Sequence, residues 1–350
     1  MTVLAFLRHL LLCGVLALVS AVVVVAMMSA GVIDRPADRK AHQNPTPKGG
    51  GLGVVVAFLL GISALYSTAA FARIADPYFL GVIAGSALIA AVSYVDDLLD
   101  WPFTVKLGAQ IVAALAVVGS GLWIRVFNVP TIGAVDVGGF GAVATLGWIL
   151  FATNATNFVD GLDGLCAGTC LIACGFLAGV AQGAGGLFVY AAAMLLGAGL
   201  VGFLPFNFPR ARIFLGDVGS QFCGFVLAVL GVAAARFEQV EMSFLLVPML
   251  LNAVLFDVAF TLARRLLAGQ SITTRHRGFL FQIAHRSGLH ARHVTLIYWA
   301  FAVYGGIGCI GFVAAPSSWK PVIPLLVIMP QLGWLALVAV RARRARIGAW

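Results

Sequence analysis

Charged side chains are scarce in this 350-residue chain, where Asp, Glu, Lys and Arg together make up only 10% of the residues. Hydrophobic residues make up 61%, and the mean hydropathy is +1.03. A soluble globular domain carries roughly 25% charged residues, so this composition excludes one. Apolar runs of about 20 residues, which suffice to cross a hydrocarbon core of ~30 Å, recur from end to end. The sequence therefore predicts one polytopic membrane domain over residues 1–350.

The motifs of zinc and redox sites are also missing. The chain contains no C-x-x-C pair and no H-E-x-x-H. Cys166, Cys170 and Cys174 follow one another at four-residue intervals inside an apolar run, where cysteine usually serves as a small packing residue. No repeat of fixed period and no low-complexity tract is visible. These absences disfavour a zinc site, a redox centre and a repeat architecture.

We expect an all-α bundle of about eleven membrane-spanning helices. The first apolar run imitates a secretory signal, but it is longer than the apolar core of a signal and further runs follow it. The 41 glycines suit close approach of helices in lipid. The expected spans are 10–33, 51–71, 78–95, 105–123, 140–157, 162–180, 187–206, 220–235, 244–262, 294–314 and 322–340.

Lys and Arg are distributed unevenly between the two ends of these spans. The positive-inside rule places the basic side in the cytoplasm, with the N-terminus outside and the C-terminus inside. The net charge of +9 then reports topology and an attraction to anionic headgroups and phosphates, and no nucleic-acid partner is expected. Of the 22 basic residues, 17 lie in the segments 34–50, 96–106, 207–219, 263–293 and 341–350.

Carboxylates gather on the same side of the expected bundle. Nine of the 13 acidic residues and five of the six histidines lie there. A charged side chain at bilayer depth costs about 2.5–3.5 kcal/mol on insertion scales, so such groups are normally retained for function or pairing. Polar loops alone would explain isolated acids, but they explain the following clusters poorly.

The first cluster is "SYVDDLLDWPFTVK", residues 93–106. Asp96, Asp97 and Asp100 end an apolar run, and their mutual repulsion is tolerable if Mg²⁺ or a cationic partner neutralises it. Lys106 follows at the start of the next run, where it could hold a phosphate. A solvated helix cap is the alternative interpretation.

The second cluster is "NATNFVDGLDGL", residues 154–165. Asn154, Asn157, Asp160 and Asp163 recur at three-residue spacing, which would line one face of a helical turn with oxygen and amide groups. Such a face suits a hard cation and the polar edges of a nucleotide. The alternative is an Asn/Asp/Gly-rich turn with a cap for the next helix, which accounts for one acid but not for all four residues.

The third cluster, "FLGDVGS", places Asp217 in a glycine-rich turn directly before a helix. Backbone N–H groups at such a helix start are available for phosphate oxygens. Phe214, three residues earlier, could stack on a base. A lone motif of this kind is weak, but it lies on the same side as the other clusters.

Two basic segments complete this side. Residues 264–293 hold six Arg and four His and suggest an anion-binding cover, with His276 beside Arg277 as its best candidates. Residues 34–53, rich in Gly and Pro, fit an ordered turn that frames a pocket, or a linker. Acid clusters suited to Mg²⁺ beside basic groups indicate a diphosphate substrate. A site at these helix ends would admit a soluble nucleotide-sugar from water and a lipid phosphate from the bilayer.

Taken in order, these motifs resemble the polyprenyl-phosphate N-acetylhexosamine-1-phosphate transferases of glycosyltransferase family 4. The resemblance runs over residues 34–293. It implies transfer of a sugar 1-phosphate from a UDP-sugar to undecaprenyl phosphate, with release of UMP, as the first membrane step of a surface glycan. It also implies Mg²⁺ as cofactor, with Mn²⁺ as the alternative, and a bacterial cytoplasmic membrane location with the active site on the cytoplasmic face. The sequence does not determine the oligomeric state, and a homodimer is one of the alternatives.

The resemblance also assigns roles to individual residues. Asp96 and Asp97 match the catalytic Asp pair, one of which is proposed to deprotonate the lipid phosphate. Asp163 and Asp217 match the positions that hold Mg²⁺ and the diphosphate. The uracil pocket is matched by Gly161, Leu162 and Phe214, and the surrounding polar shell by Asp100, Lys106, Asn157 and Asp160. From the basic loop motif, His276, Arg277 and Gln282 remain.

The chain departs from the family in "HRGFLFQ", where Phe279 and Phe281 replace a His and a Tyr. This departure argues against the MurNAc-pentapeptide translocase branch and favours enzymes that initiate surface polysaccharides. Two other classes compete with this assignment. An intramembrane prenyltransferase would also use D-D-x-x-D but expects a second Asp-rich helix. A secondary transporter would place its acids near mid-membrane, whereas Asp257, within the expected span 244–262, lies close to its cytoplasmic end.

Overall fold

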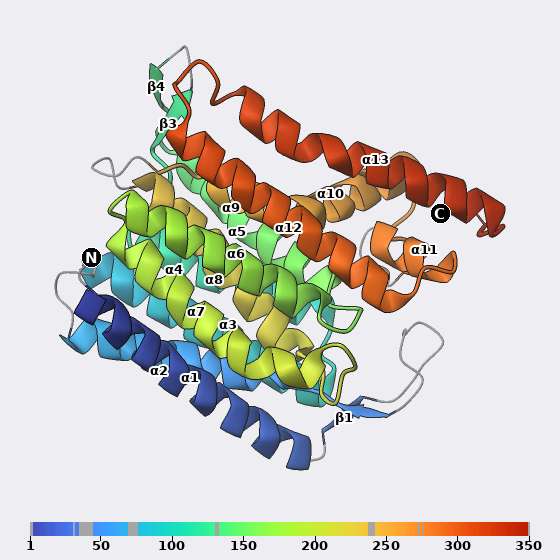
Figure 1. The fold of residues 1–350 in the computed structure, drawn as a ribbon, viewed down its shortest axis with the longest axis horizontal. Coiled ribbons are helices and arrows are strands. Elements are labelled where there is room, and N and C mark those ends of the chain that lie inside the picture. The colour runs from blue at the N-terminus through green and yellow to red at the C-terminus, as the bar shows by residue number, and fades with distance from the viewer. Residues whose placement is uncertain are drawn as a thin grey trace.

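The computed structural model describes residues 3–30, 32–34, 45–68, 76–129, 133–236, 242–271, 274 and 276–348. These residues form an all-α bundle with two small antiparallel hairpins (Figure 1). The helices are α1 (Val3–Ser29), α2 (Gly51–Thr68), α3 (Asp76–Leu99), α4 (Phe103–Gly119), α5 (Phe140–Phe158), α6 (Leu165–Gly183), α7 (Leu187–Asn207), α8 (Gly216–Arg236), α9 (Leu246–Leu250), α10 (Asn252–Leu267), α11 (Leu280–Arg286), α12 (Ala291–Ala314) and α13 (Val322–Arg344). The hairpins pair β1 (Ile33–Asp34) with β2 (Thr46–Pro47) and β3 (Val126–Val129) with β4 (Gly133–Asp136).

Eight of the described helices are long and apolar enough to cross a membrane: α1, α2, α3, α6, α7, α8, α12 and α13. Apolar runs become helices because a helix satisfies its own backbone hydrogen bonds where no water is present. The other three expected spans coincide with α4, α5 and the pair α9 and α10. The polytopic helical architecture is thus confirmed, while the count of eleven crossings and the orientation stay predictions.

The expected continuous span over 244–262 is wrong, because the chain breaks at Leu251 between α9 and α10. The side-chain amide of Asn252 then donates to the Met249 carbonyl oxygen at 2.7 Å. At the junction between α9 and α10, a side-chain amide therefore takes the place of a main-chain donor.

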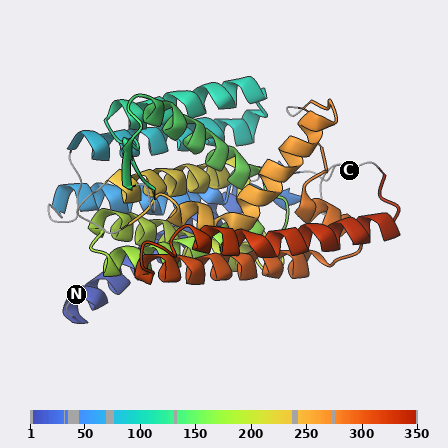
Figure 2. The ribbon, with the colours of Figure 1, turned by 90° about the horizontal axis from the view of Figure 1, so that it is seen from above.

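Helix α8 lies at the centre of the bundle. In its most apolar stretch 94% of the residues are buried, against 22% in the corresponding stretches of α1 and α13. It packs against α2, α3 and α5, while α6 and α7 form a second layer with α1 and α12. Figure 2 shows that α10 leans away from the direction of its neighbours.

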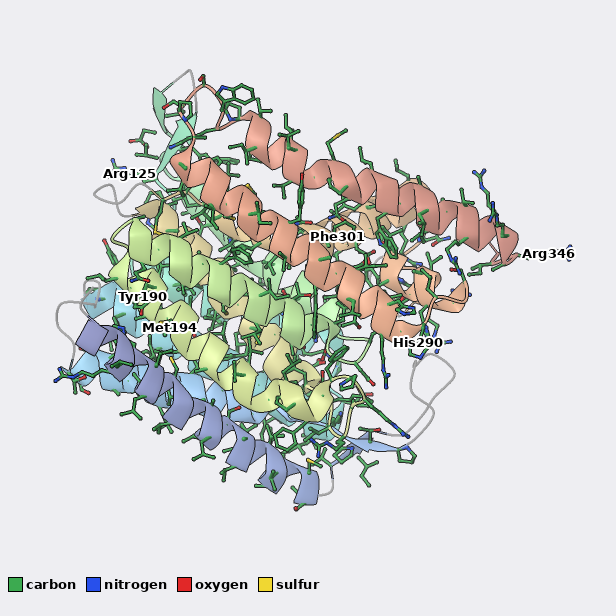
Figure 3. All side chains as sticks on the ribbon, viewed as in Figure 1. Arg125, Tyr190, Met194, His290, Phe301 and Arg346 are labelled. Atoms are coloured by element: carbon green, nitrogen blue, oxygen red, sulfur yellow. The ribbon has the colours of Figure 1, made fainter. Side chains whose placement is uncertain are left out.

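The two ends of the bundle carry different features. Arg125 lies at one end, with the β3–β4 hairpin, whereas His290 and Arg346 lie at the opposite end (Figure 3). The β1–β2 hairpin and α11 are also at this second end (Figure 1). The basic segments expected to face one side therefore share one end of the described structure.

Candidate functional site

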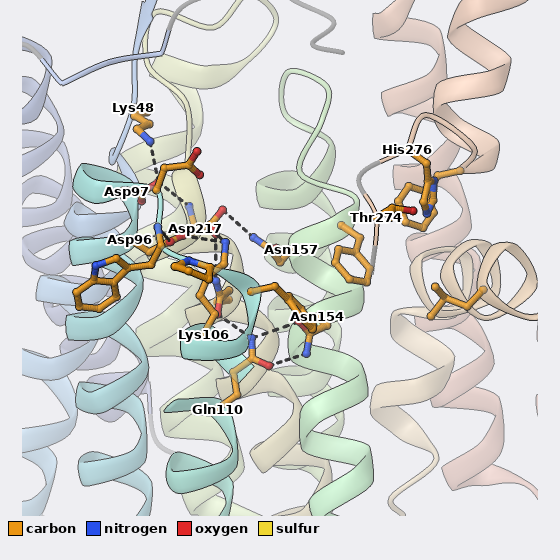
Figure 4. A pocket seen from close by; sticks show the side chains of 18 of the residues that line it. Lys48, Asp96, Asp97, Lys106, Gln110, Asn154, Asn157, Asp217, Thr274 and His276 are labelled. Carbon is orange, nitrogen blue, oxygen red and sulfur yellow. Dashed lines mark hydrogen bonds and ion pairs between the residues drawn. The ribbon is translucent and has the colours of Figure 1, made fainter. Parts of the chain in front are cut away.

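A cavity of about 530 Å³ opens among α3, α4, α5, α8 and the segment around α11 (Figure 4). It contains seven of the residues expected at the site, namely Asp96, Asp97, Asp100, Lys106, Asn157, Asp217 and His276. The rest of its lining is Lys48, Trp101, Pro102, Phe103, Gln110, Asn154, Phe158, Gln221, Leu262, Thr274, Phe279 and Gln282. The clusters that are far apart in the sequence thus meet in one place.

Lys106 joins two of the acid clusters. Its ammonium lies 2.9 Å from Asp96 Oδ2 and 3.0 Å from Asp217 Oδ2. The other Asp96 oxygen accepts a hydrogen bond from the Trp101 backbone N–H at 2.8 Å. Because Asp96 is buried, an unpaired charge there would be costly, and the bridging ammonium offsets that cost. The repulsion inferred among these carboxylates is therefore relieved by a lysine from the next helix.

Asp97 holds the start of α8. Its carboxylate oxygens accept hydrogen bonds from the backbone N–H groups of Asp217 at 3.2 Å and Val218 at 3.0 Å. These N–H groups have no partner within their own helix, and a carboxylate there also interacts favourably with the helix dipole. Gly216 has φ +76°, and a Cβ at this position would lie 2.6 Å from Asp97 Oδ2. Asp97 therefore positions Asp217 as well as facing the pocket.

The glycine-rich segment before α2 frames the pocket. Gly50 N–H donates to the Phe214 carbonyl at 2.9 Å, and Gly51 N–H donates to the Leu215 carbonyl at 2.8 Å. This pairing brings Lys48 to 3.7 Å from Asp97 Oδ1. Of the two sequence interpretations, the framing turn is confirmed for the described part of this segment, and residues 35–44 lie outside it.

Side-chain amides form the floor of the pocket. Gln110 Nε2 donates to Gln221 Oε1 at 2.9 Å, and Gln221 Nε2 donates to Asp217 Oδ2 at 3.2 Å. Asn154 Nδ2 donates to Gln110 Oε1 at 2.6 Å, so three amides are linked in one chain. Asn157 Nδ2 donates to the other Asp217 oxygen at 3.0 Å. Asp217 is thus held by two amides and one ammonium.

The expected ladder of two amides and two acids on one helical face is wrong in its second half. Helix α5 ends at Phe158, so Asn154 and Asn157 lie on it while Asp160 and Asp163 lie in the following loop. Asp163 Oδ2 accepts a hydrogen bond from Ala211 N–H at 3.0 Å and lies outside the pocket lining. Loss of hydration raises the pKa of Asp160 well above its usual value, and repulsion from Asp217 and Asp97 raises it further.

Five other expected residues lie outside the pocket lining: Asp160, Gly161, Leu162, Phe214 and Arg277. Leu162 is buried, and a Cβ at Gly161 would lie 3.0 Å from the Phe281 ring. Phe214 is half-buried beside the glycine-rich segment. The uracil pocket that the resemblance implies is therefore not assembled within this cavity, and its residues stay predictions.

Lys106 and the carboxylates of Asp96, Asp97 and Asp217 are here called the charged cluster. The pocket wall opposite this cluster is formed by residues 276–282, here called the rim. His276, Phe279 and Gln282 line the pocket, and the Phe279 ring stacks on Phe158 with centroids 5.7 Å apart and planes at 26°. Burial lowers the pKa of His276 to about 4, and the charges of Arg265 and Arg264 contribute. Its Nδ1 accepts a hydrogen bond from Gly278 N–H at 3.2 Å, as a neutral ring can.

Sequence reasoning missed several pocket residues. Lys48, Gln110, Gln221 and Phe158 were not candidates. Two of them carried a usable signal, because Gln110 and Gln221 are amides inside otherwise apolar helices, where polar groups need a partner. Lys48 stands directly before three glycines, a pattern that allows close backbone approach.

The carboxylates of the pocket can be compared with the ligands that the expected divalent cation prefers. Mg²⁺ is usually bound by one or two carboxylates, with waters and substrate phosphates completing its shell. Among the residues that the structure describes, no three His, Cys, Asp or Glu side chains converge on one point. Asp96 and Asp217, however, already share one cation, the Lys106 ammonium. The residues fit a cation shared with a phosphate substrate rather than a cage made by protein alone.

Comparison with known proteins identifies relatives of the chain. The family model described as glycosyl transferase family 4 matches residues 79–235. A probable undecaprenyl-phosphate N-acetylglucosaminyl 1-phosphate transferase of Bacillus subtilis (strain 168) is 30% identical over 266 residues, covering 73% of this chain and 72% of the relative. A decaprenyl-phosphate N-acetylglucosaminephosphotransferase of Mycobacterium tuberculosis (strain CDC 1551 / Oshkosh) is 33% identical over 319 residues, covering 82% and 76%.

A third relative represents the other branch considered above. The phospho-N-acetylmuramoyl-pentapeptide-transferase of Leuconostoc mesenteroides is 34% identical over 206 residues, covering 55% of this chain and 63% of the relative. The similarity to the two N-acetylglucosamine phosphotransferases extends over a larger part of the chain. The family model over residues 79–235 includes Asp96, Asp97, Lys106, Asn157 and Asp217 of the pocket.

Proposed function

Because this chain belongs to glycosyl transferase family 4, we propose that it transfers N-acetylglucosamine 1-phosphate from a UDP-sugar to undecaprenyl or another polyprenyl phosphate. UMP is the second product, and the reaction is the first membrane step of a surface glycan. The names of the two N-acetylglucosamine phosphotransferase relatives support this sugar. The pocket lies at the basic end of a membrane bundle, which we propose faces the cytoplasm, where a soluble donor and a lipid acceptor can meet.

The observation that carries this proposal is the alternation of cations and carboxylates in one cavity. Lys106 lies between Asp96 and Asp217, and Lys48 lies beside Asp97. Ammonium groups held in this way can neutralise phosphate oxygens, which suits a reaction catalysed by positioning and charge neutralisation. A prenyltransferase would require a second Asp-rich helix, whereas the partners of Asp96 and Asp97 here are a lysine and the start of α8.

In the proposed reaction an oxygen of the lipid phosphate attacks the phosphorus that carries the sugar. The P–O bond to the UMP leaving group breaks, and a new diphosphate links lipid and sugar. Lys106 and Lys48 would hold phosphate oxygens, while the amides of Asn157 and Gln221 fix the orientation of Asp217. Asp96 and Asp97 are the candidates to accept a proton from the lipid phosphate, and we do not assign it to either one.

A divalent cation, Mg²⁺ with Mn²⁺ as the alternative, would be held by Asp217 together with Asp96. It would supply charge neutralisation of the diphosphate. Asp163, assigned to the metal by resemblance, bonds Ala211 N–H instead. Asp163 is therefore a proposed metal ligand by resemblance alone, and it lies on the loop that carries Asp160, outside the pocket lining.

The test is release of UMP by purified protein supplied with undecaprenyl phosphate, Mg²⁺ and a panel of UDP-N-acetylhexosamines. We expect UDP-N-acetylglucosamine to be the best donor and chelation of divalent cations to abolish turnover. The double variant Asp97→Ala with Asp217→Ala should lose activity. No turnover with any donor, or full activity of the double variant, would contradict the proposal.

A matched control is available at the far end of the bundle. Asp136 is an exposed carboxylate paired with Arg125 at 3.5 Å. Exposed pairs of this kind contribute roughly 0–1 kcal/mol to stability. Asp136→Ala should therefore keep wild-type turnover, which separates loss of the site from a general effect of removing an acid.

A further inference from the structure

A buried carboxylate outside the charged cluster accepts four hydrogen bonds. Asp257 on α10 is 1% exposed. Its Oδ1 accepts from Leu280 N–H at 2.6 Å and from Thr261 Oγ1 at 3.2 Å. Its Oδ2 accepts from Phe281 N–H at 3.1 Å and from the Tyr298 hydroxyl at 2.6 Å. A carboxylate removed from water is costly unless such bonds replace its hydration, and here both oxygens are filled.

Two of these donors mark the beginning of α11. Leu280 and Phe281 are its first two residues, and N–H groups at a helix start have no partner within the helix. Asp257 supplies the missing acceptors from another helix, and its negative charge favours that position. Leu280 and Phe281 are fully buried. The start of α11 is thus fixed to α10.

The same face of α10 holds the residue just before α11. Asp257, Thr261 and Arg264 are spaced by four and three residues, so they share one side of the helix. The Gly278 carbonyl accepts a hydrogen bond from Arg264 Nη2 at 3.0 Å, and Thr261 Oγ1 lies 3.5 Å from the same carbonyl oxygen. One row of α10 side chains therefore forms hydrogen bonds with residues between 278 and 281, which make up most of the rim.

The rim in turn forms the pocket wall that faces the charged cluster. Phe279 stacks on Phe158, which follows Asn157 in α5, and Asn157 donates to Asp217. An imidazole, an aromatic face and an amide suit the sugar and base of a sugar nucleotide. His276 Nδ1 and Gln282 Oε1 are already bonded by backbone N–H groups of the rim, and a prenyl chain would offer no polar partner to the second imidazole nitrogen or to the amide N–H₂. The donor is therefore the substrate that the rim is fitted to contact.

We propose that Asp257 is a positioning residue for donor binding: by anchoring the start of α11 to α10, it holds His276, Phe279 and Gln282 in the pocket wall. Its effect on the donor rests on the function proposed above. The geometric part, that Asp257 orders the rim, stands independently of which reaction the pocket performs.

The kinetic test uses Asp257→Asn, which keeps the shape but turns an amide N–H₂ toward backbone donors. A loosened rim must be ordered each time the donor binds. This free-energy cost weakens binding of the substrate and of the transition state by the same amount. We expect the KM for the UDP-sugar to rise by roughly tenfold, while kcat stays within about threefold. The KM for the lipid phosphate should not change, because the rim is fitted to the donor.

The second measurement is hydrogen exchange, which needs no turnover. In Asp257→Asn, backbone amides in 276–286 should exchange faster, while those of α8 keep wild-type rates. Tyr298→Phe removes one of the four donors and should shift both readouts in the same direction by less. It also remains a test if the Asn variant fails to fold.

Asn252 provides the control on the same helix. It is also buried, and its side chain bonds the Phe301 carbonyl at 2.9 Å and Gln331, not the rim. Asn252→Ala should lower thermal stability yet leave donor KM and rim exchange unchanged. Unchanged donor KM and rim exchange in folded Asp257→Asn or Tyr298→Phe would overturn the inference. Failure of the wild type to release UMP would instead overturn the function, while exchange would still decide whether Asp257 orders the rim.

Discussion

At the floor of the pocket, three uncharged amides determine the orientation of a charged residue. Gln110 orients Gln221, and Gln221 in turn donates to Asp217. An amide can do this without adding charge at a depth where charge is costly. The position of Asp217 therefore depends on residues that do not themselves carry the chemistry.

Replacing Gln110 with Leu should expose this dependence. The substitution leaves the half-buried amide of Asn154 and the buried amide of Gln221 each short of a partner, at a cost of about 1–3 kcal/mol. A shift of Asp217 should then lower turnover by roughly tenfold to a hundredfold. Turnover and the midpoint of thermal unfolding in detergent provide the measurement. Gln182→Leu, at an exposed position near the end of α6, is the control; wild-type turnover in Gln110→Leu would contradict the argument.

His276 gives the structure a pH dependence whose sign can be stated. Its pKa is lowered to about 4, first by burial and then by Arg265 and Arg264, whereas an unfolded His titrates near ~6.5. Because the folded pKa is the lower of the two, protonation favours the unfolded chain. The stability linked to His276 is therefore complete above about pH 6.5 and is lost as the pH falls from there toward 4.

Thermal unfolding at about pH 7.5 and about pH 5 tests this linkage. We expect His276→Gln to lose less stability than the wild type over this interval, because Gln does not titrate. His293→Gln removes an exposed His and should behave as the wild type does. An identical loss in His276→Gln and wild type would show that His276 is not the group responsible.

At the scale of helices, the site depends on close contact between α2 and α8. A Cβ added at Gly51 would lie 2.3 Å from Gly219 Cα and 2.7 Å from the Leu215 carbonyl oxygen. Both obstacles are backbone atoms, which cannot rotate away. The two helix starts that carry Lys48 and Asp217 into the pocket are therefore held together through glycines.

Gly51→Ala should force these helices apart. We expect a loss of at least about 1–3 kcal/mol in stability, together with loss of turnover, because the start of α8 moves relative to Asp97. Gly175→Ala in α6 is the matched control, since nothing lies within 4 Å of its added Cβ. In that helix Ala is favoured over Gly by about 1 kcal/mol. A Gly51→Ala variant as stable and active as Gly175→Ala would refute this role of the contact.

At the scale of the whole molecule, the expected orientation follows from charge rather than from the fold. The basic segments and the pocket share one end of the bundle, and Arg125 lies at the other (Figure 3). Of the six cysteines, Cys13 is half-buried and the other five are buried. Labelling of the native thiols by a water-soluble reagent should therefore be weak. Single introduced cysteines can therefore report which end faces the cytoplasm.

Two variants, Ser317→Cys and Ser271→Cys, test the orientation. Ser317 lies between α12 and α13, Ser271 lies after α10, and both positions are exposed. A membrane-impermeant maleimide added to intact bacterial cells should label the first variant, and the second only after lysis. This pattern is expected because the Ser271 segment is rich in Arg. The reverse labelling would invert the orientation and place the pocket outside the cell.

Much of the architecture was predictable from the sequence because lipid leaves the backbone few choices. An apolar run of sufficient length must satisfy its hydrogen bonds internally, so hydropathy alone indicated where the long helices lie. The break between α9 and α10 was not predicted, because it depends on the side-chain bond from Asn252 to Met249, which composition does not reveal.

The sequence by itself determined the helical membrane class, the segments that become long helices and the one-sided concentration of acids and bases. It also indicated Asp96, Asp97, Lys106 and Asp217, because polar groups in apolar surroundings stand out. Only the tertiary structure decided which groups meet. Asp97 and Val218 are 121 residues apart in the chain yet bonded, whereas Asp163, near in sequence to Asn157, lies outside the pocket lining. Distances between helices arise from packing, which a linear pattern does not encode.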